Sequence, residues 1–191
     1  MAYNTTTWQA DSNTKANNTT IGSNIYIYKS MHGGFQSWGT SGGDSTNLIF
    51  IPMFEGNETE SPNVGQYNIY TWATGGSLLK LYYVSSEIDD MSGVTLIVKS
   101  YRYRPDGSTN TGVIDTISNW TELSTGTVTP QNTDRGVLVT FAETDSSYNA
   151  GDLMCIGMQV TSGGNDFDTN SRTTFTIIIK EDWNDIISSN V

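Results

Sequence analysis

Ten short segments rich in β-branched and aromatic residues follow one another between residues 25 and 180, separated by clusters of Gly, Asn, Asp, Ser and Pro. Val, Ile, Tyr, Phe, Trp and Thr dominate these segments, and such side chains suit a pleated, half-buried surface. The separating residues are those that form turns. We therefore expect strands at 25–29, 47–54, 67–73, 78–84, 94–103, 113–117, 120–128, 136–142, 153–160 and 173–180.

The number and spacing of these strands predict an all-β chain that folds as an antiparallel β-sandwich. A jelly roll is favoured within this class, because the connections before residue 47 and between residues 54 and 67 are long enough to cross between two sheets. An immunoglobulin domain is disfavoured, because Cys155 is the only cysteine. Residues 25–191 are expected to form this single domain, and a chain of 191 residues can bury one good core.

Residues 1–24 differ from the rest of the chain, because they are polar and follow no strand or helix period. Their large apolar side chains are Tyr3, Trp8 and Ile21, too few for the segment to bury itself. The segment is either a frayed tail or an N-terminal arm that attaches to a neighbouring subunit, with Trp8 as the anchor. No secretory signal is recognisable at its start, so we expect synthesis and folding in a host cytoplasm.

The charge balance disfavours nucleic acid as a partner. The formal net charge is −11 and the sequence pI is about 4.2, whereas binding to phosphates requires clustered Lys and Arg. No apolar run approaches the roughly 20 residues of a membrane helix, so no membrane partner is expected either.

Residues for catalysis are sparse. His32, the only histidine, is expected in a glycine-flanked loop, and no Gly-x-Ser-x-Gly nucleophile motif occurs. A glycosidase would require two carboxylates facing each other across a groove. The acidic clusters at residues 55–60 and 143–145 lie in expected turns, where solvated side chains are the ordinary case. We predict that the chain is not an enzyme and needs no cofactor.

One expected turn carries oxygen side chains at alternate positions, namely Asp166, Asp168 and Asn170. Such spacing suits Ca²⁺, although the glycine and the distal glutamate of an EF-hand are missing. A hairpin tip rich in turn-forming residues explains the same sequence, so these residues are kept only as a weak calcium candidate and no metal site is predicted.

The two C-terminal strands are apolar on both faces. Met154, Ile156 and Met158 form one face of the first strand, but Leu153 and Cys155 lie on the other, and Ile178 lies on the second face of the last strand. A strand with one solvated face would alternate more strictly. We expect another copy of the chain to cover Leu153, Cys155 and Ile178. A homotrimer is the first choice, because jelly rolls often associate around a threefold axis and homo-oligomers are closed by symmetry.

Residues 136–182 resemble the closing strands of jelly-roll virion proteins of tailed, marine-type bacteriophages. The resemblance is carried by Ala150-Gly151-Asp152 before an apolar strand, by a polar loop and by the final strand TTFTIIIK. It implies a trimeric, non-enzymatic protein on the outside of the virion, attached to capsid or tail proteins by an N-terminal segment. The chain has no heptad or repeat stalk, so a capsid decoration protein or the tip of a head or tail fibre is favoured over a long fibre.

Two other functions fit the same fold. Exposed aromatic side chains such as Tyr26, Tyr28 and Tyr82 stack on sugar rings, so a carbohydrate- or receptor-binding module that recognises a host surface glycan is one alternative. A surface-filament subunit that exchanges a strand with its neighbour is the other.

Overall fold

The computed structural model describes residues 26–36, 48–54, 59–85, 95–128, 136–162 and 172–183. Its strands are β1 (Tyr26–Gln36), β2 (Ile49–Phe50), β3 (Thr59–Glu60), β4 (Tyr70–Thr71), β5 (Gly75–Ser85), β6 (Thr95–Tyr103), β7 (Thr121–Val128), β8 (Gly136–Thr140), β9 (Ser147–Tyr148), β10 (Leu153–Ser162) and β11 (Arg172–Asp182). Two 3₁₀ turns, η1 (Gln66–Asn68) and η2 (Ile117–Asn119), lie in the connections.

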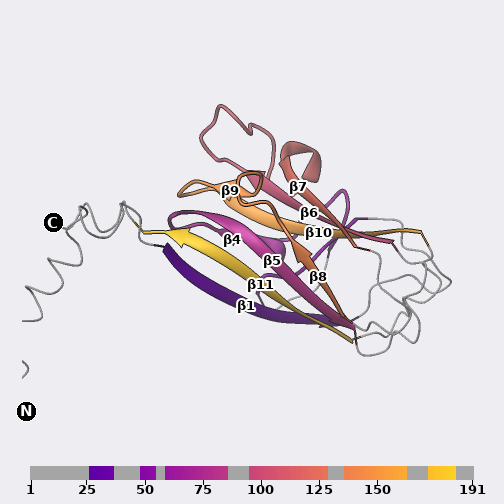
Figure 1. Cartoon of the computed structure of the whole chain (residues 1–191). Helices are drawn as coiled ribbons and strands as arrows, with labels where there is room; N and C mark the ends of the chain where they lie inside the picture. Colours follow the sequence, from indigo (N-terminus) through magenta and orange to yellow (C-terminus); the bar gives the residue numbers. More distant parts are fainter. Residues whose placement is uncertain are drawn as a thin grey trace, which may run out of the picture.

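The strands form two sheets that face each other (Figure 1). We call them the A sheet, with the order β1-β11-β5-β8 and β9 beside β5, and the B sheet, with the order β3-β2-β10-β6-β7 and β4 beside β10. Four antiparallel pairs are nested along the chain: β6 with β7, β5 with β8, β2 with β10, and β1 with β11. A long hairpin rolled so that successive pairs fall in opposite sheets has this order, which confirms the predicted jelly roll.

The main core lies between the two sheets and follows the alternation of each strand. Phe175, Ile177 and Ile179 of β11 are at most 4% exposed and face Met154 and Ile156 of β10, which are fully buried. The intervening residues of β11 point to the other side of the A sheet, as the period of two requires. Burial of each such side chain stabilises the fold by roughly 1.5–3 kcal/mol.

A second apolar cluster covers the opposite face of the B sheet, and this corrects one prediction. Cys155 is fully buried there against Tyr101, and Leu153 packs on the same cluster. The cover comes from the chain itself, because Val64 and Trp120 belong to the connections before β4 and between β6 and β7. Cys155 is therefore covered within this chain, and Leu153 is partly buried against the same cluster.

Some local expectations were also wrong. Residues 113–117 form no strand, and their β-type pairing is one isolated bridge, outside the named strands, between Asn63 and Thr116. His32 lies within β1 and not in a loop, because β1 pairs with β11 along its whole length. Trp8 and the calcium candidates Asp166, Asp168 and Asn170 lie outside the described residues. In the described part of the chain, no helix is long and apolar enough to span a membrane.

Candidate functional site: the outer face of the A sheet

Apolar side chains gather on the face of the A sheet that is turned away from the B sheet. Tyr82 and Val84 of β5 are 39% and 47% exposed, and Leu138 of β8 is 44% exposed. Tyr82 lies directly opposite Leu138 in the register, so their side chains are neighbours. Ile178 of β11 is half-buried beside them, and Tyr28 of β1 is 65% exposed. We call Tyr28, Tyr82, Val84, Leu138 and Ile178 the outer apolar face.

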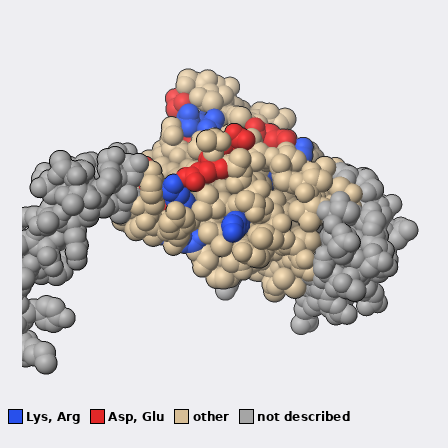
Figure 2. Space-filling model, viewed as in Figure 1, with Lys and Arg blue, Asp and Glu red and all other residues tan. Residues whose placement is uncertain are grey.

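This face carries little of the chain's negative charge. Figure 2 shows most of the visible acidic side chains gathered in one band, while the rest of this view is largely uncharged with isolated basic side chains. At one end of β11, Asp182 and Glu143, which pairs with Lys180, lie beyond the outer apolar face. Lys80 of β5 lies opposite Ile178 of β11 within the outer apolar face. A protein with a net charge of −11 repels its own copies, and a surface without acidic groups reduces that repulsion.

His32 also points outward from β1, and its ring is held by two hydroxyl groups. Hydrogen bonds join Nδ1 to the Thr176 hydroxyl oxygen at 2.9 Å and Nε2 to the Ser30 hydroxyl oxygen at 3.2 Å. A catalytic triad would instead place a carboxylate on Nδ1 to orient the ring. The Thr176 contact links β1 to β11, while the Ser30 contact lies within β1. The lack of enzymatic activity stays a prediction.

A buried carboxylate fixes the edge of the A sheet behind this face. Glu181 of β11 accepts hydrogen bonds from the Tyr70 hydroxyl and the Trp183 indole, both at 2.9 Å, and pairs with the Lys29 ammonium at 2.6 Å. Burial raises the pKa of the Glu181 carboxyl, but the hydrogen bonds from Lys29, Trp183 and Tyr70 outweigh burial, and the pKa lies below its ordinary range. The carboxylate therefore ties β1 of the A sheet to β4 of the B sheet.

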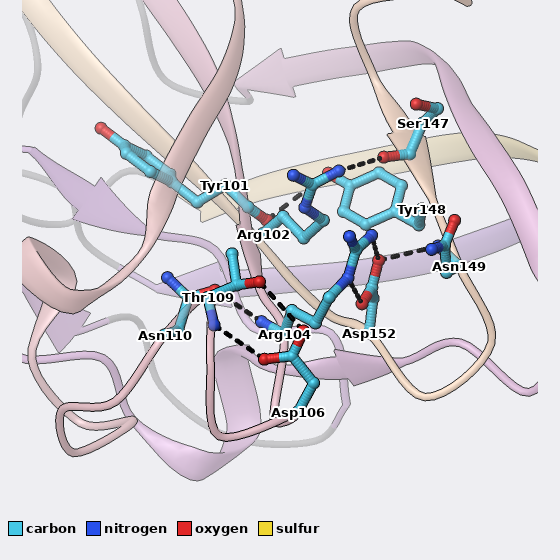
Figure 3. Close-up of polar contacts among 10 residues, drawn as sticks. All are labelled: Tyr101, Arg102, Arg104, Asp106, Thr109, Asn110, Ser147, Tyr148, Asn149 and Asp152. Carbon is cyan, nitrogen blue, oxygen red and sulfur yellow. Dashed lines mark hydrogen bonds and ion pairs between the residues drawn. The ribbon is translucent and has the colours of Figure 1, made fainter.

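A second buried carboxylate holds the cover of the B sheet in place (Figure 3). Arg104 forks onto Asp152 through Nε and Nη2, both at 2.8 Å, and the Asn149 backbone amide donates to the same carboxylate at 2.7 Å. Burial alone would raise the pKa of the Asp152 carboxyl. The hydrogen bonds from Arg104 and Asn149 outweigh burial, so the pKa lies below its ordinary range. The bidentate pair joins the start of the β6–β7 connection to the turn before β10.

The predicted interface residues thus divide into three groups. Leu153 and Cys155 belong to the second core, Ile178 lies on the outer apolar face, and Trp8 is outside the described residues. Within the described part of the chain, no group of three or more His, Cys, Asp or Glu side chains is placed to hold a metal ion.

The sequence contains a signal for the residues that were missed. Val137 and Val139 are at most 7% exposed, so the strand GVLVT must place Leu138 on the opposite, outer face. Tyr82 and Val84 flank the buried Tyr83 in the same way. In these strands, an apolar residue next to a core position therefore indicates a side chain on the outer apolar face.

No protein-family model and no curated protein sequence matches the chain. Among solved structures, the chain is similar to murine APRIL, with 11% identity, a TM-score of 0.32, and coverage of 78% of this chain and 98% of that one. It is similar to a protein of the T13 particle of infectious bursal disease virus, with 15% identity and a TM-score of 0.37, over 83% of this chain but only 31% of that chain. Desmodium yellow mottle tymovirus gives 12% identity and a TM-score of 0.33 over 83% and 89% of the two chains. At such low scores, the strand pairing described above defines the fold.

Proposed function

We propose that the chain is a structural protein on the outside of a virus particle, and that it self-associates through the outer apolar face of its A sheet. The observation that carries the proposal is the exposed row of Tyr82, Val84 and Leu138 beside Ile178, on a face of the A sheet that belongs to neither of the two buried apolar clusters. The resemblance of residues 136–182 to virion proteins of tailed phages supports a capsid decoration protein or a fibre component as the particular role.

Association through this face is physically reasonable. Contiguous exposed apolar patches are uncommon on monomers and mark interaction surfaces. Each Å² of apolar surface removed from water contributes about 25 cal/mol, which has to exceed the entropic cost of association. The scarcity of acidic side chains on the face lowers the electrostatic cost for a chain with a net charge of −11. A closed homotrimer is our preferred assembly.

Charged substitutions on the outer apolar face should dissociate the assembly. We expect Leu138→Asp and Ile178→Asp to convert an oligomer into monomers at micromolar concentration, because an unpaired charge at an interface costs several kcal/mol. Light scattering coupled to size-exclusion chromatography measures the mass. Val113→Asp is the matched control, because Val113 is 65% exposed and lies in the β6–β7 connection, away from this face. A monomeric wild type, or equal loss in the control, would contradict the proposed surface.

The virion assignment has a direct test. Particles purified from the source by gradient sedimentation should contain this chain at a stoichiometry that mass spectrometry can quantify. Protease treatment of intact particles should release its peptides before those of internal proteins. Recovery of the chain only in the soluble fraction would contradict a particle role.

A further inference from the structure

A polar groove lies at one end of the outer face of the A sheet and adjoins the outer apolar face, because Lys180 in its lining pairs with Tyr28. Its volume is about 570 Å³, within the range of small-molecule sites. Gly75 and Gly76 at the start of β5 line the groove, and the missing side chain of Gly75 leaves space on this face of the sheet, whereas a Cβ on Gly76 would point toward the core residue Trp72. Tyr26 and Lys180 line one side of the groove, and Asn149 lines it as well.

The conformation of the lining is fixed by contacts within the chain. The Lys180 ammonium forms an ion pair with Glu143 and lies 3.7 Å from the centre of the Tyr26 ring. Gly76 cannot carry a side chain, because a Cβ there would lie 2.2 Å from the backbone oxygen of Lys180. Gly75 can, because the nearest atom to its Cβ would be 3.4 Å away. The groove is therefore preformed, and Gly75 is a position from which it can be filled.

The charges of the groove restrict its ligand. Glu143 and Asp182 are acidic and Lys180 is basic, so the lining has one net negative charge. That balance disfavours phosphate and other anions, and the ammonium of Lys180 disfavours a cationic ligand beside it. Most of the lining is polar, so an apolar ligand would leave polar groups desolvated without partners. A neutral ligand with many hydroxyl groups meets all three conditions.

We infer that this groove binds a neutral saccharide. The apolar C–H face of a sugar ring packs on the exposed surface of Tyr26, which is 38% accessible. Hydroxyl groups of the sugar donate hydrogen bonds to the carboxylates of Glu143 and Asp182. They accept a hydrogen bond from the side-chain amide of Asn149, whose backbone amide donates to Asp152. The inference goes beyond the proposed particle role and does not depend on it, because the groove is complete within one chain.

Binding is tested on the full chain by saturation-transfer NMR with methyl glycosides of glucose, galactose, mannose and N-acetylglucosamine, and with an array of neutral oligosaccharides. We expect at least one neutral probe to bind. Tyr26→Ala should weaken its binding about tenfold or more, and Gly75→Val should do the same by filling the groove. Tyr67→Ala is the matched control, because Tyr67 of η1 is 48% exposed and belongs neither to the groove lining nor to the outer apolar face.

The outcomes distinguish binding in this groove from non-specific binding and from a change in oligomeric state. Loss of binding in Tyr26→Ala and Gly75→Val, with binding within about twofold of wild type in Tyr67→Ala and unchanged oligomeric mass, supports the site. Absence of binding to every neutral probe at about 10 mM, which corresponds to almost no affinity, overturns it. Equal loss in Tyr67→Ala, or tighter binding of inorganic phosphate than of any sugar, also overturns it.

Discussion

Replacing Cys155 with aspartate is expected to destabilise the fold itself by about 4 kcal/mol or more, since a charge without a partner would be buried. Cys155 is fully buried between Tyr101 and the segments that carry Val64 and Trp120. Burial already raises the pKa of its thiol well above the ordinary value, which shows how strongly this position disfavours charge. Equilibrium unfolding in urea, followed by tryptophan fluorescence, measures the free energy of unfolding.

The control for this experiment is Cys155→Val, which preserves an apolar side chain of similar size and should cost less than about 1.5 kcal/mol. The oligomeric mass distinguishes the two models of the second face. If Cys155→Asp unfolded at the same urea concentration as wild type but lost its oligomer, a partner subunit and not the same chain would cover the face.

The sequence indicated that both faces of β10 are buried, but it could not indicate what buries the second one. Leu153 and Cys155 interrupt the alternation, and this signal was correct. The cover comes from connections with no strand period, and the Arg104–Asp152 ion pair that holds one of them joins residues 48 positions apart. Periodicity reports burial of a position and contains no information on such distant contacts.

Two errors in the strand assignment have specific physical causes. Val113 and Ile114 are β-branched and suggested a strand, but they are exposed in a loop. The Tyr103 hydroxyl donates to the Gly112 carbonyl at 2.6 Å and the Asn119 amide to the Val113 carbonyl at 2.9 Å, so side chains satisfy backbone acceptors that a ladder would otherwise use.

The opposite error occurred at His32. Gly33 and Gly34 suggested a turn, but β1 continues through them because tertiary pairing with β11 outweighs local preference. Gly33 is also required by packing, since a Cβ there would lie 2.3 Å from the ring of Phe175. Gly33 is therefore needed because the core residue Phe175 approaches the backbone closely there, and the pair Gly33-Gly34 does not form a turn.

The candidate surface was only partly predictable. Ile178 was expected on an uncovered face and lies on one, while its role in an interface stays a prediction. The alternation of GVLVT places Leu138 on the face opposite Val137 and Val139, but its position beside Tyr82 could be known only from the pairing of β5 with β8, because Tyr82 lies 56 positions earlier in the chain. Which strands share a sheet follows from the nested pairing, and no single segment encodes it.

Replacing Glu181 with leucine should destabilise the fold by about 3 kcal/mol, because the substitution removes the acceptor for three donors at once. The Tyr70 hydroxyl and the Trp183 indole would each lose a 2.9 Å hydrogen bond. Lys29 also loses its partner, but its side chain is 43% exposed and can be solvated by water. The expected loss in the free energy of unfolding therefore lies at the lower end of the range measured when a buried ion pair is broken. Urea unfolding at neutral pH measures the loss.

The pH dependence of the Glu181→Gln variant tests the same contacts with less disturbance. The folded-state pKa of Glu181 is lowered, so its contribution is fully present above the unfolded value of about 4.3 and is lost as the pH falls through the folded value. Wild-type stability should therefore decrease below about pH 5. Glu181→Gln should show a shallower decrease, with the remainder due to groups such as Asp152, whose pKa is also lowered. Parallel decreases in wild type and variant would show that Glu181 does not carry the paired charge.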